Sequence, residues 1–117
     1  MTSATPEDCL FCKIVAGDIP ADVVHETERT FAFRDVDPQA PLHVLVVPRQ
    51  HQPNAAATTA ADGADAAALI AAADAVARAE GYDSYRLVLN TGADAHQTVF
   101  HTHLHVLAGR AMTWPPG

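Results

Sequence analysis

Hydrophobic and polar positions alternate with a period of two in several short segments of the chain. Phe31 and Phe33 alternate with Ala32 and Arg34, which is typical of a half-buried strand. Further strands are predicted over 23–26, 43–47, 85–90 and 99–107, and the segment 43–47 is rich in β-branched residues. The pattern therefore predicts about five short strands.

A helical period appears in one long segment and one short segment. Over 62–80, an apolar stripe recurs at helical spacing and Gly81 can end the helix; its members are Leu69, Ala72, Ala73 and Val76. Asp8 can cap a short helix over 9–16, with Gly17 as its stop. The order of helix, strands, helix and strands predicts an α+β fold with a mostly antiparallel sheet.

The remaining segments lack a regular period. Residues 1–7 are expected to form a flexible tail, and 50–61 is expected to be irregular. The last four residues, Trp114 to Gly117, contain two prolines and cannot be regular structure. A chain of 117 residues fits one domain, which we place at 8–117.

The charge pattern narrows the class of partner. The net charge is −7, from 7 basic and 14 acidic residues, and the basic residues form no cluster. Neither a nucleic-acid footprint nor binding to an anionic membrane is therefore expected. The alanine-rich stretch 64–79 carries three charged residues, and the N-terminus lacks a secretory pattern. A cytoplasmic location is expected, where Cys9 and Cys12 would be free thiols or metal ligands.

The segment 99–107 carries the candidate chemistry, because His101, His103 and His105 recur at a spacing of two. On a strand all three rings would lie on one face. Three imidazoles can make a catalytic zinc site. However, the outer two would lie about 13 Å apart on a flat strand, which is awkward for one tetrahedral ion. A row of imidazoles better suits a central nucleophile with neighbours that orient it or handle protons.

The loop before this segment offers neutral donors. Asn90, Gln97 and Thr98 bring amides and a hydroxyl close in sequence to the three histidines. By itself this is an ordinary polar hairpin loop, but beside three imidazoles we expect an anion-binding role.

These motifs resemble the signature of the histidine triad (HIT) superfamily, and the Hint branch in particular. The resemblance rests on Asn90, Gln97 to Val106, Cys9 to Ile14, Asp18 to Pro20, Ala32 to Val36, Pro38 to Pro41, His43 to Pro48 and the Trp-Pro-Pro-Gly ending. It covers roughly 8–117 and is weakest in the long helix. It implies a homodimeric purine nucleoside phosphoramidase, which converts adenosine or guanosine 5′-phosphoramidates into the monophosphate and an amine without a required cofactor.

The resemblance also implies a role for each matching residue. His103 would be the nucleophile that forms a nucleotidyl-histidine intermediate, His105 would contact phosphate and help protonate the leaving group, and His101 and His43 would support them. The nucleotide would be held by residues from several segments: Asp35 at the ribose; Phe11, Ile14, Phe33, Val36 and Leu45 at the base; Asn90, Gln97 and Thr98 at the phosphate. Trp114 would lie near the neighbouring subunit's site and help choose substrates.

Two positions depart from the Hint pattern. His96 stands where glycine is usual, so its side chain could alter the phosphate loop or add a donor. Thr98 replaces a more common serine and keeps the hydroxyl.

The pair Cys9 and Cys12 has two interpretations. The spacing alone fits two thiols one turn apart on a short helix. Some HIT proteins bind structural zinc with such a pair and histidines at the positions of His51 and His101, and all four residues are present. Zinc there would make His101 structural and leave His103 and His105 for catalysis.

Three other functions remain open. A dinucleoside polyphosphate hydrolase would use the same nucleophile, although the Trp-Pro-Pro-Gly ending speaks against it. A nucleotide-binding adaptor with little turnover could keep an intact triad, and a metal-binding protein could use the histidine row. A nucleotidyltransferase is disfavoured, because that branch carries glutamine where this chain has His105.

Overall fold

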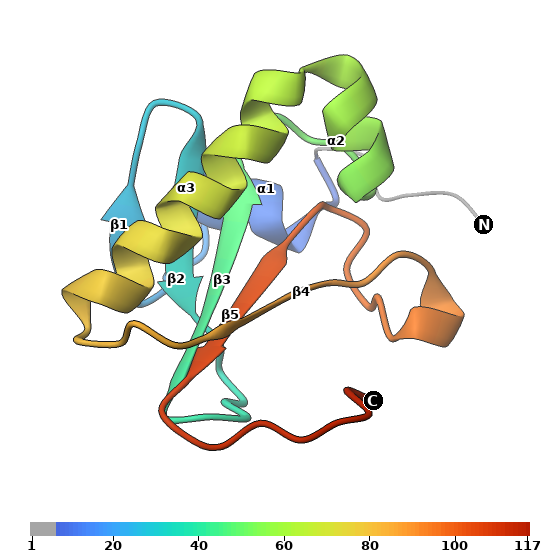
Figure 1. Ribbon diagram of the computed structural model, residues 1–117. Helices are drawn as coiled ribbons and strands as arrows, with labels where there is room; N and C mark the ends of the chain where they lie inside the picture. Colours follow the sequence, from blue (N-terminus) through green and yellow to red (C-terminus); the bar gives the residue numbers. More distant parts are fainter. Residues whose placement is uncertain (1–6) are drawn as a thin grey trace.

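The computed structural model describes residues 7–117, which form a five-stranded sheet with helices on both faces (Figure 1). The strands are β1 (Val23–Glu26), β2 (Thr30–Arg34), β3 (Leu42–Pro48), β4 (Arg86–Leu89) and β5 (Leu104–Ala108). Their order is β1-β2-β3-β5-β4, and every neighbouring pair is antiparallel. The predicted α+β class is confirmed. The predicted flexible tail lies outside the described residues, except for Glu7.

The central strand β3 is buried along its whole length because both of its faces are covered. Val44 and Val46 pack on the side of α3 (Gly63–Ala79), whose predicted stripe is buried against the sheet. Leu45 and Val47 pack on the opposite side, near α1 (Leu10–Val15). In Figure 1, α3 crosses the front of the sheet and α1 lies behind it.

The strand register places polar side chains on the α1 face. Leu45 of β3 lies opposite His105 of β5, and His43 lies two residues earlier on the same strand. Because side chains alternate along a strand, His43, Leu45 and His105 share one face. The sheet thus presents two imidazoles beside the apolar residues that pack around α1.

A helix occupies part of the segment that was expected to be irregular, so that prediction was wrong. Helix α2 (Ala55–Ala61) begins after Asn54, whose side chain accepts a hydrogen bond from the backbone of Ala57 at 2.9 Å. The alanine-rich composition supports helix once this cap is made. The buried Thr58 faces the triad segment, where its hydroxyl lies 2.7 Å from that of Thr102.

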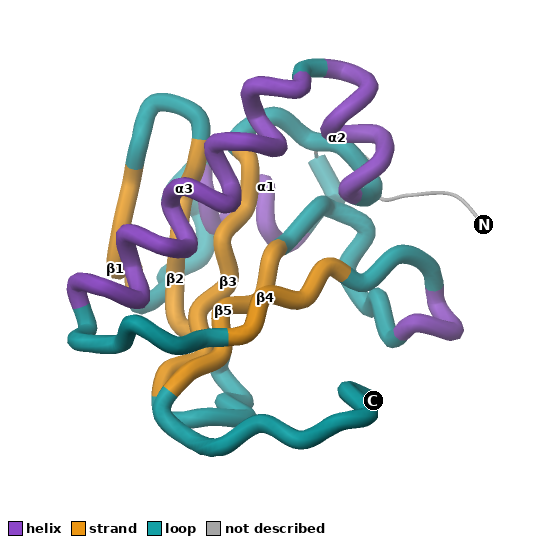
Figure 2. The backbone as a smooth tube through the Cα atoms, in the orientation of Figure 1, coloured by secondary structure: helices purple, strands orange, loops and turns teal. Residues whose placement is uncertain are grey.

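The histidine strand is shorter than predicted. Strand β5 begins at Leu104, so His101 and His103 lie in the loop that leads into it (Figure 2). There the chain bonds to the connection after β3 instead of continuing the ladder: Thr102 donates from its backbone to the carbonyl of Gln52 at 2.9 Å. The three rings therefore do not form a flat row on one strand.

Both helix ends beside glycine behave as expected, but one predicted cap does not. Gly17 and Gly81 follow α1 and α3 with φ of 84° and 89°. Helix α1 is capped by Cys9, whose sulfur accepts from the backbone of Cys12, and not by Asp8. Among residues 7–117, no helix combines the length and apolar character that a membrane crossing needs.

Candidate functional site

A cavity of about 420 Å³ opens on the α1 face of the sheet beside the histidines. One part of its lining is apolar and comes from α1, β2, β3 and the loop before β5. Another part is polar and includes His43, His103 and His105. The full lining is Leu10, Phe11, Ile14, Phe33, Arg34, Asp35, Val36, Asp37, Gln39, His43, Leu45, His96, Thr98, Val99, His103 and His105. The cavity thus joins an apolar slot to a group of imidazoles.

The hydrogen bonds of His103 define its tautomer. Its Nδ1 lies 2.8 Å from the carbonyl oxygen of His101, which can only accept. Nδ1 must therefore carry the proton, and Nε2 keeps its lone pair. The ring is buried and forms a T-shaped contact with Phe11, with ring centroids 5.0 Å apart. This side chain is held as a neutral imidazole with one free nitrogen.

The pair His43 and His105 is oriented by a backbone group. The N–H of Gln39 donates to Nδ1 of His43 at 3.0 Å, so the proton of the neutral ring is on Nε2. That Nε2 lies 2.9 Å from Nδ1 of His105 and donates to it. The neutral His105 ring consequently carries its own proton on Nε2. The carboxylate of Asp35 lies 3.4 Å from the same nitrogen of His43 and adds an acceptor.

Burial keeps these imidazoles neutral. Desolvation lowers the pKa of His43 and of His103, although Asp35 opposes the shift in both. It also lowers the pKa of His105 to about 4, with repulsion from His103, His43 and His96 adding to the effect. A neutral imidazole is the form that can attack an electrophile.

The loop between β4 and the triad is held together by Gln97. Its buried side chain accepts from the N–H of Gly92 at 2.9 Å and donates to the carbonyls of Pro53 and Val99. The oxygen and the nitrogen of the Gln97 side-chain amide are therefore both bonded to backbone groups of the chain. The exposed Thr98 lies beyond it and lines the cavity, as does His96.

The structure brings most of the predicted residues together, but not all of them. The half-buried Asn90, the buried Gln97 and the exposed Trp114 are not among the residues that line the cavity. Conversely, five residues that line the cavity were not predicted as site residues: Leu10, Arg34, Asp37, Gln39 and Val99. The contribution of Gln39 is a backbone N–H, which no side-chain pattern could have revealed.

The first histidine of the triad belongs to a different cluster. Nδ1 of His101 lies 3.4 Å from the sulfur of Cys9, 3.5 Å from that of Cys12 and 3.2 Å from Nδ1 of His51. Its Nε2 donates to the carbonyl of Pro48 at 2.9 Å, so the Nδ1 lone pair faces the sulfurs. One potential ligand atom from each of the four residues lies within 4.8 Å of the others.

The cluster has the dimensions of a tetrahedral zinc site. With Zn–N bonds of about 2.05 Å and Zn–S bonds of about 2.3 Å, the N···N edges are about 3.3 Å and the N···S edges about 3.6 Å. The structure matches these edges: the two Nδ1 atoms of His51 and His101 lie 3.2 Å apart, and the sulfur of Cys12 lies 3.4 and 3.5 Å from them. Burial, with Cys9 adding, raises the pKa of the Cys12 thiol to about 11. A bound cation would favour the thiolate instead.

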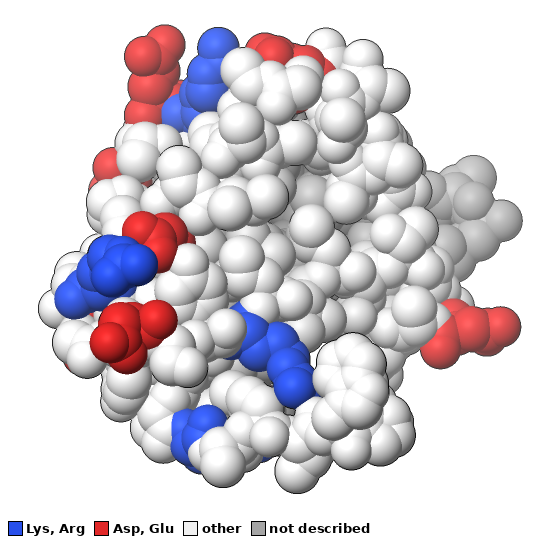
Figure 3. Space-filling view, viewed as in Figure 1, with Lys and Arg blue, Asp and Glu red and all other residues white. Residues whose placement is uncertain are grey.

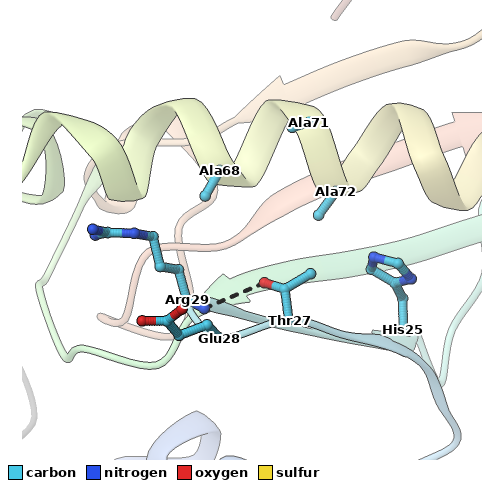
Figure 4. Close-up of a pocket in the computed structure, with 7 residues that line it drawn as sticks. All are labelled: His25, Thr27, Glu28, Arg29, Ala68, Ala71 and Ala72. Atoms are coloured by element: carbon cyan, nitrogen blue, oxygen red, sulfur yellow. Dashed lines mark hydrogen bonds between the residues drawn. The ribbon is translucent and has the colours of Figure 1, made fainter.

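A second cavity, of about 350 Å³, lies between the β1–β2 hairpin and α3 (Figure 4). Its helix side is formed by Ala68, Ala71 and Ala72, and the hairpin contributes His25 and Arg29. His25 is its one imidazole, so it lacks the facing imidazoles of the first cavity. On the face drawn in Figure 3, the basic residues lie apart from one another.

Comparison with known proteins identifies the family. A family model described as HIT domain matches residues 16–112. The chain belongs to this family. An uncharacterized HIT-like protein from Synechocystis is 48% identical over 112 residues, which cover 95% of this chain and 98% of that protein. The fold and the histidine motif of this chain are thus those of a HIT protein.

Solved structures agree with this assignment. A HIT family hydrolase from Legionella pneumophila is 47% identical, with a TM-score of 0.89 over 93% of this chain and 99% of the other. A histidine triad protein from Clostridium difficile is 36% identical, with a TM-score of 0.86 over 91% and 94%. A histidine triad nucleotide-binding protein from Candida albicans is 29% identical, with a TM-score of 0.72 over 93% and 84%.

Proposed function

We propose that this HIT protein is a purine nucleoside phosphoramidase of the Hint branch. It hydrolyses adenosine or guanosine 5′-phosphoramidates to the nucleoside monophosphate and an amine. Similar proteins named as a hydrolase and as a nucleotide-binding protein support the general class. The observation that carries the proposal is the free Nε2 of the neutral His103, which lines the cavity.

The first half of the reaction transfers the nucleotide to the protein. Nε2 of His103 attacks the α-phosphorus, and the bond from phosphorus to the amine nitrogen breaks as the new N–P bond forms. The departing nitrogen takes the Nε2 proton of His105, whose other nitrogen is held by His43. In the second half, water attacks phosphorus, the bond to His103 breaks, and the proton lost by water restores His105.

The rest of the cavity is suited to a nucleoside. The apolar residues around Phe11 and Leu45 offer a slot for a purine base. The half-buried carboxylate of Asp35 can accept hydrogen bonds from ribose hydroxyls. The hydroxyl of Thr98 and nearby backbone N–H groups can bind phosphate oxygens. Gln97 then acts by holding the loop rather than by touching the nucleotide.

Substitution of the nucleophile tests the proposal. His103→Ala should abolish hydrolysis of an adenosine 5′-phosphoramidate, while far-UV circular dichroism stays that of the native fold. Mass spectrometry of wild-type protein quenched during turnover should find a nucleotide on the peptide that contains His103. Undiminished turnover of the variant would contradict the nucleophile assignment. Faster cleavage of diadenosine polyphosphates than of phosphoramidates would indicate the other hydrolase class, and nucleotide binding without turnover would indicate an adaptor.

We also propose that Cys9, Cys12, His51 and His101 hold a structural zinc ion. The ion would join the start of α1 to the segment that leads into the triad. Purified protein should contain about one zinc per chain, and the Cys12→Ser variant should contain much less and melt at a lower temperature. Because His103 and His105 are not in this cluster, the proposed reaction does not use this zinc ion. Loss of turnover on chelation, at a temperature where the protein stays folded, would contradict this separation.

Assembly as a homodimer is part of the same proposal. The exposed Ile70 on α3 and the exposed Leu89 on the edge strand β4 are apolar groups that a second copy could cover. Light scattering on the eluting protein should give twice the mass of one chain. A monomer at micromolar concentration would contradict the expected dimer.

A further inference from the structure

The backbone at His96 has an unusual conformation for a residue with a side chain. Its φ is 67° and its ψ is 32°, and it is the one non-glycine residue with positive φ in the described part of the chain. Histidine tolerates this left-handed region better than most residues, but glycine adopts it without strain. Glycines adopt positive φ at four other positions of this chain. An imidazole at this position is therefore kept at a cost in stability.

The surrounding loop holds the backbone of His96 in a fixed position. His96 directly follows the 3-10 turn η1 (Ala93–Ala95) as its C-cap, and its N–H donates to the carbonyl of Ala93 at 3.0 Å. The next residue, Gln97, closes the loop with a backbone bond to Gly92 and with its buried side chain. The imidazole thus projects from a fixed turn at the rim of the catalytic cavity.

His96 lies on the outer side of the group of imidazoles. His103 is buried against Phe11, and the ring centroid of His105 lies 5.1 Å from that of His103. His105 is half-buried and interacts electrostatically with His96, which is exposed. Burial therefore decreases from His103 through His105 to His96, toward solvent.

The decrease in burial from His103 through His105 to His96 follows the direction in which the leaving amine would depart. With the nucleoside in the apolar slot, the attacking nitrogen and the departing nitrogen lie on opposite sides of phosphorus. The departing amine leaves past the proton of His105, toward solvent. The exposed His96 is the cavity imidazole best placed to meet whatever the amine carries.

Arg34, Asp35 and Asp37 are the charged side chains that line the cavity, and none of them is free to bind a carboxylate of the leaving amine. Arg34 also lines the cavity, but its guanidinium is bonded to Glu80 at 2.8 Å and lies near Asp22. Asp35 and Asp37 bring carboxylates, which would repel a negatively charged leaving group. An imidazole N–H is a donor in either protonation state, and its bond to a carboxylate is charge-assisted when the ring is protonated.

Resting on the proposed phosphoramidase function, we propose that His96 contacts the leaving amine and favours amines that bear a carboxylate, such as amino acids. Its imidazole donates a hydrogen bond to the leaving group's carboxylate as the phosphorus–nitrogen bond breaks.

The experiment compares two substrates that differ at one group. They are the adenosine 5′-phosphoramidates of alanine, with a free carboxylate, and of alaninamide, which is neutral there. The values of kcat/KM for both are measured with wild type, His96→Gly and His96→Asn. His25→Asn makes the same change outside this cavity and serves as the matched control.

The wild type should prefer the carboxylate substrate, and His96→Gly should lower that preference about tenfold. His96→Asn keeps a neutral donor at a position that asparagine tolerates, so its preference should fall less. His96→Gly should melt no lower than wild type, because glycine relieves the backbone strain. A residue needed only for folding would give the opposite thermal result. His25→Asn should preserve the preference.

The outcomes separate this inference from the function on which it rests. If wild type cleaves phosphoramidates and the His96 variants keep the same preference, the inference is wrong and the proposed function stands. Equal losses on both substrates would also overturn it, because a contact to the carboxylate must act on one of them. If wild type cleaves neither substrate, the proposed function fails and the inference falls with it.

Discussion

The contact between α2 and the triad segment provides the sharpest test of the packing described above. The hydroxyls of Thr58 and Thr102 lie 2.7 Å apart, and both residues are buried. The hydroxyl of Thr102 also donates to the carbonyl of Gln52 at 3.3 Å. Thr102 has one proton, so Thr58 must donate to Thr102. The two positions therefore differ in what each substitution leaves behind.

Valine replaces each hydroxyl by a methyl group of similar size. Thr102→Val leaves the Thr58 proton buried without its acceptor, which costs about 1–3 kcal/mol of unfolding free energy. Thr58→Val leaves Thr102 its bond to Gln52, so the expected loss is smaller, about 0.5–1.5 kcal/mol. The double variant lacks both hydroxyls, so no buried hydroxyl of this pair is left without a partner. Its loss of unfolding free energy should be about 1 kcal/mol less than the sum of the losses in the two single variants.

Urea denaturation at pH 7 and 25 °C measures these differences. With a slope of about 2 kcal/mol per molar urea, Thr102→Val should lower the midpoint by about 1 M. Thr59→Val removes an exposed hydroxyl from the same helix and should change stability by less than about 0.5 kcal/mol. The reasoning is refuted if Thr58→Val costs as much as Thr102→Val, or if the two losses simply add.

Two further predictions concern pH and backbone geometry. His105 is neutral in the fold with a pKa of about 4, whereas an unfolded histidine takes up a proton below about pH 6.5. Its contribution to stability is therefore present above pH 6.5 and lost as the pH falls toward 4. In urea titrations of the metal-free protein, His105→Gln should reduce the change of unfolding free energy with pH over this range. An unchanged pH dependence would contradict the prediction. Gly109 has φ of 95°, and an added Cβ would lie 2.8 Å from a carbon of Pro41, whereas Gly81 has φ of 89° and open space. Gly109→Ala should therefore lower the melting temperature clearly more than Gly81→Ala, and equal losses would exclude the steric contact with Pro41.

The local pattern of apolar and polar residues was sufficient to predict the strands of the sheet and the long helix that covers one of its faces. The alternation of Phe31 and Phe33 predicted β2, and the stripe that begins at Leu69 predicted α3, because burial on one face imposes the period of each element. The three histidines at alternate positions also pointed to the HIT family, which the comparisons confirm. The spacing alone could not say which nitrogen of each ring is free.

Tertiary contacts decided the rest, because the groups concerned are distant in sequence or belong to the backbone. The N–H of Gln39 sets the tautomer of His43, and through it that of His105. His101 leaves the expected row, since its Nδ1 turns toward Cys9 and its Nε2 toward the carbonyl of Pro48, the last residue of β3. The amino-acid sequence determined which side chains are available to the site; only the packing of β3, α1 and the loop before β5 separated the proposed nucleophile His103 and the proposed proton donor His105 from the candidate metal ligand His101.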